Sequence, residues 1–214
     1  MKSFLFFLIG FFLLVSQKSV ASTEDTNHCI WCFHPFSVNI HAGLWSPLGQ
    51  LNSYYNPSPF FDFNLGLVLV SKVKLEIGLG PILHDLSQPL NIFYQETSYR
   101  EQVTSGGSVG GAVTYHLYDN KVVFIDAVSR FRWESIILEK IPFENPSSKY
   151  DEKLAISTFG LSFGIDAWFN IVRSHNFGFR ILYGYAGYNW DSKLISNIGG
   201  QSLSTSLIYR FPKR

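Results

Sequence analysis

Hydrophobic and polar positions alternate one by one along much of the chain, and the clearest case is the stretch 154–169. From Thr158 to Asp166 every second residue is large and apolar, and the residues between them are small or polar. A period of two predicts a β-strand with two different faces. The polar face carries glycine, serine, threonine and one aspartate without lysine or glutamate, which is typical of the packed interior of a narrow barrel. We therefore expect the apolar face to meet lipid.

The same alternation recurs along the chain and predicts eight strands, at 36–44, 61–69, 73–80, 109–117, 123–134, 154–169, 177–186 and 202–211. The predicted connections alternate between long and short. The long ones are 45–59, about Asp85–Thr104, Ser135–Lys153 and Asp191–Gly199, and the short ones are Ser71-Lys72, Asp119-Asn120 and Asn170–Asn176. Short periplasmic turns and longer extracellular loops give outer-membrane barrels this rhythm. The prediction is an all-β fold, an eight-stranded antiparallel up-and-down transmembrane β-barrel over residues 36–214.

The N-terminus has the features of a secretory signal. Lys2 supplies a positive start, Phe4 to Val15 is apolar apart from Gly10, and Ser19-Val20-Ala21 offers a small-x-small cleavage site. The apolar run is shorter than the roughly 20 residues that a spanning helix needs. We expect a signal peptide at 1–21 and a periplasmic N-terminal leader at 22–35, the alternative being a retained anchor.

Composition fits a membrane barrel and would also fit an aromatic-rich secreted sandwich. Aromatic residues make up 17% of the chain and charged residues only 15%, whereas soluble domains average about 25% charged. The formal net charge of +1 gives no indication of a nucleic-acid partner. Aromatic residues near strand ends predict two belts at the membrane interfaces. The outer belt would hold Trp45, Tyr54, Tyr55, Phe60, Trp133, Tyr188 and Trp190, and the inner one Phe36, Tyr118, Trp168, Phe177 and Phe211.

Charges of both signs occupy the polar faces of the predicted strands, whereas the apolar faces carry none. In a narrow lumen such charges must pair, which predicts a lumen ion-pair network of Lys74, Glu76, Asp126, Arg130, Arg132, Glu134, Asp166 and Arg180. The same residues could line a conductive path, although eight strands leave little room for one. A soluble, lipocalin-like barrel shows the same period with its faces reversed, and is the alternative fold.

The chain ends in Ser206-Leu207-Ile208-Tyr209-Arg210-Phe211, with aromatic residues at alternate positions of the last strand. Together with the strand rhythm, this ending resembles that of the small outer-membrane barrels of the OmpA/OmpX-like type. The resemblance covers Phe36–Phe211 and is strongest to the "outer membrane protein β-barrel domain" proteins. The resemblance implies a Gram-negative outer membrane, lipid and lipopolysaccharide as surroundings, no cofactor, and recognition of the last strand by the barrel-insertion machinery. The family commonly stops at the aromatic residue, whereas here Pro212-Lys213-Arg214 follow.

Two clusters have residue types that suggest chemistry. Cys29-x-x-Cys32, flanked by His28 and His34, lies in the leader. In an oxidising periplasm we expect a disulfide between Cys29 and Cys32. A zinc site is the alternative, and a thioredoxin-like role would need a βαβ context that the sequence lacks.

The second cluster is His84-Asp85-Leu86-Ser87, at the outer end of the third predicted strand. His84 and Ser87 are candidate catalytic residues, because some eight-stranded barrels modify lipid A with serine, histidine and a carboxylate. We expect instead a non-enzymatic protein. Its role would be either to bind an unknown surface ligand through the extracellular loops, chiefly Asp85–Thr104 and Ser135–Lys153, or to serve a structural purpose. The alternative is a lipid A-modifying acyl hydrolase or transferase, or an accessory barrel in secretion or envelope assembly.

Overall fold

The computed structural model describes residues 36–70, 72–88, 90–94, 97–120, 123–139, 154–172, 175–187 and 198–211. The predicted signal peptide at 1–21 and the leader at 22–35 lie outside the described residues. Within the described part, no helix is both long and apolar enough to cross a membrane.

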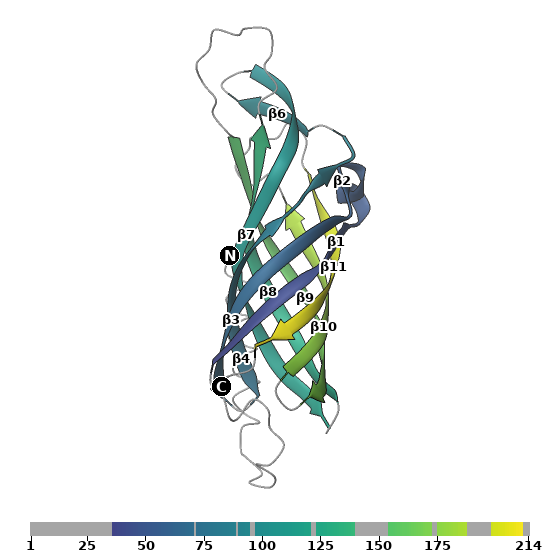
Figure 1. Cartoon of the computed structure of the whole chain (residues 1–214). Helices are drawn as coiled ribbons and strands as arrows, with labels where there is room; N and C mark the ends of the chain where they lie inside the picture. Colours follow the sequence, from purple (N-terminus) through teal and green to yellow (C-terminus); the bar gives the residue numbers. More distant parts are fainter. Residues whose placement is uncertain are drawn as a thin grey trace, which may run out of the picture.

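Eight strands close into a single ring (Figure 1). They are β1 (Phe36–Pro47), β3 (Ser58–Val70), β4 (Val73–Ile82), β7 (Thr97–Asp119), β8 (Val123–Glu139), β9 (Leu154–Val172), β10 (His175–Gly187) and β11 (Gly199–Arg210). The order around the ring is β4-β3-β1-β11-β10-β9-β8-β7, and pairing of β4 with β7 completes it. Every pairing is antiparallel. The predicted fold, an eight-stranded up-and-down barrel, is confirmed.

The apolar faces of the strands point outward and the polar faces point inward. Along β3, Phe61, Phe63 and Leu65 are exposed, whereas the intervening Asp62 and Asn64 are buried. The same arrangement holds on β10, where Tyr183 is exposed and Arg180 is buried. A soluble barrel would bury its apolar face in the lumen, so the lipocalin-like alternative is wrong for this chain. Lipid is the environment in which an outward apolar face is stable.

Several strands are longer than the sequence pattern predicts. Residues 97–104, predicted as loop, form the start of β7, which pairs with β6 (Leu90–Tyr94) in a hairpin. β8 continues to Glu139 because it has a partner strand on each side. Glu139 pairs with Gln102 of β7, and Leu138 pairs with Leu154 of β9. The backbone ladder thus extends past the point where the side chains stop alternating. Figure 1 shows β6 and the start of β7 rising beyond one end of the ring, which we call the outer end.

The outer mouth of the ring is covered by a folded piece of two connections. It consists of the 3-10 helix η1 (Gly49–Ser53), the short strand β2 (Tyr55–Asn56) and its partner β5 (Asp85–Leu86). Gly49 has a φ of 59°, in the left-handed region that glycine adopts without steric cost, where the chain turns into η1. We call η1, β2 and β5 the outer cap.

The predicted aromatic belts are only partly correct. Trp45, Tyr55, Phe60 and Trp168 are buried inside the barrel, so their assignment to the belts is wrong. The outward-facing residues are Phe36, Tyr118, Trp133, Phe177 and Phe211. Tyr54 lies between η1 and β2 and is half-buried, and Tyr188 and Trp190 lie outside the described residues.

Candidate functional site: the lumen and the outer mouth

Arg180 is the centre of the largest group of charges in the lumen. It lies on β10, where its Nε donates to Asp166 Oδ1 over 2.6 Å and its Nη2 to Asp166 Oδ2 over 2.7 Å. The same Nη2 donates over 2.9 Å to Oε2 of Glu76, on the opposite side of the ring. All three side chains are at most 2% exposed. The ion pairs therefore cross the lumen and tie opposite walls together.

Further polar side chains extend this group. Lys74 pairs with Oε1 of Glu76, to which Asn39 Nδ2 also donates over 3.3 Å. Asn39 in turn accepts a hydrogen bond of 3.1 Å from Nε of Arg210. The Arg210 guanidinium lies 4.0 Å from the centroid of the Trp168 ring, a cation–π contact. The buried Trp168 thus packs against the edge of the charge cluster.

Two smaller groups complete the lumen. Asp62 on β3 accepts a hydrogen bond of 2.6 Å from Nη2 of Arg130 and a second from Nη2 of Arg132, both on β8. Near the opposite end, Nδ1 of His116 lies 2.8 Å from Oδ1 of Asp126, and its Nε2 lies 3.2 Å from Oδ2 of Asp119. These contacts give most of the lumen charges an oppositely charged neighbour, as their burial requires.

The residues predicted for the lumen network fall into these groups with one exception. The structure brings Lys74, Glu76, Asp166 and Arg180 together, puts Arg130 and Arg132 in a second group, and puts Asp126 in a third. Glu134 is buried higher in the barrel, near the outer cap. Sequence reasoning missed four partners, all of which lay on polar strand faces: Asn39, Asp62, His116 and Arg210.

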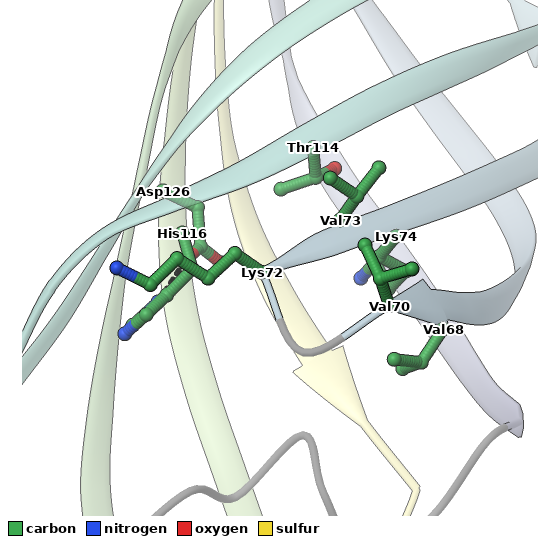
Figure 2. Close-up of a pocket in the computed structure, with 8 residues that line it drawn as sticks. All are labelled: Val68, Val70, Lys72, Val73, Lys74, Thr114, His116 and Asp126. Carbon is green, nitrogen blue, oxygen red and sulfur yellow. Dashed lines mark hydrogen bonds and ion pairs between the residues drawn. The ribbon is translucent and has the colours of Figure 1, made fainter. Parts of the chain in front are cut away.

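A pocket lies at the end of the barrel that holds the β3–β4 turn (Figure 2). Its empty volume is about 190 Å³, part of it open solvent, and it is lined by Val68, Val70, Lys72, Val73, Lys74, Thr114, His116 and Asp126. Ligand pockets usually measure about 300–1,000 Å³. The pocket is smaller than that and partly walled by valine side chains, so it does not indicate a small-molecule site.

His84 and Ser87 each contact other residues in this structure. The His84 ring is buried between Trp45 and Tyr55, at 5.4 and 5.3 Å between ring centroids. Burial lowers the pKa of His84 to about 4, so the imidazole is neutral at neutral pH. Ser87 is exposed, and its hydroxyl donates over 2.9 Å to the carbonyl of Ser53. A serine nucleophile needs its base within hydrogen-bond reach, and this hydroxyl is directed at a backbone carbonyl instead.

The described residues contain no group of three histidine, cysteine or acidic side chains placed to hold a metal ion. Cys29 and Cys32 lie outside the described residues, together with His28 and His34. The disulfide and its zinc alternative therefore stay predictions.

The outer cap is packed into the mouth by apolar side chains. Leu51 and Tyr55 are 0% exposed. They belong to one apolar cluster with residues of the barrel wall: Trp45, Phe60, Ile82, Ile136, Ile156, Ala186 and Ile198. The lumen therefore has a hydrophobic layer at its outer end and charged layers below it.

Gly106 provides the space that this layer needs. A Cβ at Gly106 would lie 2.6 Å from Cδ2 of His84, which is closer than carbon atoms can approach. We expect Gly106→Ala to lower the free energy of unfolding by about 1–3 kcal/mol through overpacking, as measured by urea unfolding in lipid vesicles. Gly107→Ala is the matched control, because a Cβ there would meet only the Gly80 carbonyl at 3.9 Å. Equal stabilities of the two variants would contradict the packing at the mouth.

The fold and the orientation of its faces define the class of protein: a small eight-stranded transmembrane β-barrel of the outer-membrane type. Closed barrels with an outward apolar band and a polar interior span outer membranes, so the chain is a cell outer-membrane protein.

Comparison with the solved structure of Neisserial surface protein A agrees at the level of the fold. Neisserial surface protein A has a TM-score of 0.57 at 12% identity, over 84% of this chain and 98% of that one. A major outer membrane protein of Thermus thermophilus has a TM-score of 0.45 at 13% identity, over 83% and 100%. For the attachment invasion locus protein Ail of Yersinia pestis the TM-score is 0.36 at 12% identity, over 82% and 96%. No family model and no curated protein sequence matches the chain.

Proposed function

We propose that this protein is a non-enzymatic outer-membrane barrel whose role is binding at the cell surface through its extracellular segments. The observation that carries the proposal is the extension above the ring. β6 pairs with β7 from Leu90 opposite Glu101 to Tyr94 opposite Thr97, and β7 pairs with β8 up to Gln102 opposite Glu139. A sheet that continues beyond the membrane-spanning ring presents protein surface to the outside.

The β6 strand ends this sheet. In the strand order β6 has β7 on one side, and on the other side no strand from the described residues. A strand at a sheet edge carries backbone donors and acceptors that a partner's extended segment can use. This supports a protein or peptide ligand for the extension, which overlaps the predicted binding loop at 85–104.

An epitope tag inserted between β6 and β7, at residues 95–96, tests which side of the membrane the extension occupies. We expect antibody to bind intact cells that carry the tagged protein. A tag in the β3–β4 turn beside Lys72 is the control and should react only after the outer membrane is permeabilised. The reverse pattern would contradict the proposal.

The last strand supports recognition by the barrel-insertion machinery. Phe211 continues the pairing beyond β11, since its backbone N–H donates over 3.0 Å to the carbonyl of Val38. Leu207 and Phe211 are exposed on the outward face and Tyr209 is half-exposed there. Lipid and lipopolysaccharide would surround the barrel at this face.

The competing proposal is a lipid A-modifying acyl hydrolase or transferase that uses His84 and Ser87. The burial of His84 and the hydrogen bond of Ser87 to Ser53 argue against it. We expect deletion of the whole gene to leave the lipid A profile unchanged in mass spectrometry. A changed profile, restored by the wild-type chain and by neither His84→Ala nor Ser87→Ala, would establish the enzyme instead. An accessory role in secretion or envelope assembly would require a periplasmic partner, testable by crosslinking through Cys29.

A further inference from the structure

The outer cap is a unit held together by its own hydrogen bonds. Asn56 Nδ2 donates over 2.9 Å to Oδ2 of Asp85, which joins β2 to β5. Ser87 N–H donates over 2.9 Å to the carbonyl of Tyr54, and the Ser87 hydroxyl to that of Ser53 over the same distance. These bonds link the two connections that form the cap. The cap is also bonded to β3, because the Asp85 N–H donates over 3.1 Å to Oγ of Ser58, which donates over 2.9 Å to the carbonyl of Asn56.

The cap meets the wall mainly through apolar side chains. The wall residues of the apolar cluster come from β1, β3, β4, β8, β9 and β10 and from the residue before β11. At Gly200, the approach is so close that a Cβ would lie 3.3 Å from Cγ of Leu51. The N–H of Leu48, the residue before η1, donates over 2.8 Å to the carbonyl of Gln201 on β11, which continues the β1–β11 ladder by one residue. The cap residues Leu51 and Tyr55 thus share one apolar cluster with residues from most strands of the wall.

The lumen directly under the cap is polar. Ser108 and Glu134 are cross-strand partners on the inward faces of β7 and β8, one inward-facing pair below Gly106 and Ile136. Deeper still, Asp62 bridges Arg130 and Arg132. An apolar layer over a polar lumen is a barrier to water and ions, as in hydrophobic gates that work by dewetting.

We propose that the outer cap is a lid, and that small hydrophilic solutes enter the upper lumen from the cell exterior when it lifts. The structure shows the closed state. Lifting the lid exposes the level of Ser108 and Glu134, and the Asp62–Arg130–Arg132 layer limits how far a solute can go. Access to the lumen is a property beyond the binding role proposed for the β6–β7 extension, and it does not depend on that role.

Labelling of a cysteine placed under the cap tests this proposal. The reporter is Ser108→Cys, in a chain that also carries Cys29→Ser and Cys32→Ser, and the probe is a small cationic methanethiosulfonate. Leu51→Asn puts an amide into the apolar layer, so it should raise the labelling rate at least about tenfold. Asn52→Ala, at an exposed neighbouring position, should leave the rate unchanged.

A second reporter separates lid opening from loosening of the barrel. Ser37→Cys lies near the opposite end of β1, and its labelling rate should be the same whether or not the cap carries Leu51→Asn. Heat-dependent gel mobility checks that each variant is folded, and Leu51→Ala replaces Leu51→Asn if the latter does not fold. The proposal is overturned if the Ser108→Cys rate changes less than about twofold, or if both reporters accelerate together.

Discussion

Replacing Arg180 with methionine is expected to lower the free energy of unfolding by about 3–5 kcal/mol. Arg180 is 2% exposed and pairs with both Asp166 and Glu76. The substitution leaves Asp166 buried without its cation, and such an uncompensated charge costs more than the lost ion pair alone would suggest. Urea unfolding of the protein in lipid vesicles, followed by tryptophan fluorescence, measures the change.

The double variant Arg180→Met with Asp166→Asn is the informative control. It removes the charge that the single variant leaves unpaired, while Glu76 keeps its contact with Lys74. We expect the double variant to recover most of the lost stability. Lys72→Met, at an exposed position in the β3–β4 turn, should have little effect. If Arg180→Met costs no more than Lys72→Met, the charges across the lumen do not hold the walls together.

Replacing Leu65 with arginine is expected to cost about 2–4 kcal/mol in lipid vesicles. Leu65 is 65% exposed at the middle of β3, and on a soluble protein an arginine at such an exposed site would be tolerated. In a membrane this position lies at mid-depth, where an arginine on the lipid face is costly. The same unfolding experiment measures the difference from the wild-type chain.

The control for this second prediction is the same substitution at a position nearer the membrane surface. Leu83 is 51% exposed just beyond the outer end of β4, and there the same substitution should cost only about 0–1 kcal/mol. Equal costs at Leu65 and Leu83 would mean that the outward face does not meet a membrane.

The strands and the direction of their faces could be predicted because alternation is a local property of the sequence. The same alternation contained a signal that the aromatic assignments missed. Trp45 follows the inward series Asn39, His41, Gly43 on β1, and Trp168 follows Gly164 and Asp166 on β9. Their positions in the alternation place both rings in the lumen. Proximity to a strand end was a weaker indicator than position in the alternation.

The outer cap could not be predicted in the same way. Leu51 and Tyr55 lie between proline, glycine and asparagine residues without periodicity, and this composition indicates an open loop. Their burial depends on Ile136 and Ile156, which are about a hundred residues away in the sequence. The pairing of Arg180 with Glu76 likewise depends on how the ring closes, since β4 and β10 are not neighbours.

The most direct test of a lipid-facing barrel is its mobility in SDS gels before and after boiling, using the outer-membrane fraction. A closed barrel satisfies all its backbone hydrogen bonds within the ring, so the unheated protein should stay folded in SDS and migrate differently from the boiled protein. We expect this shift, with the protein absent from the soluble periplasmic fraction. A protein that is soluble in the periplasm and shows no shift would contradict the assignment of the outward faces to lipid.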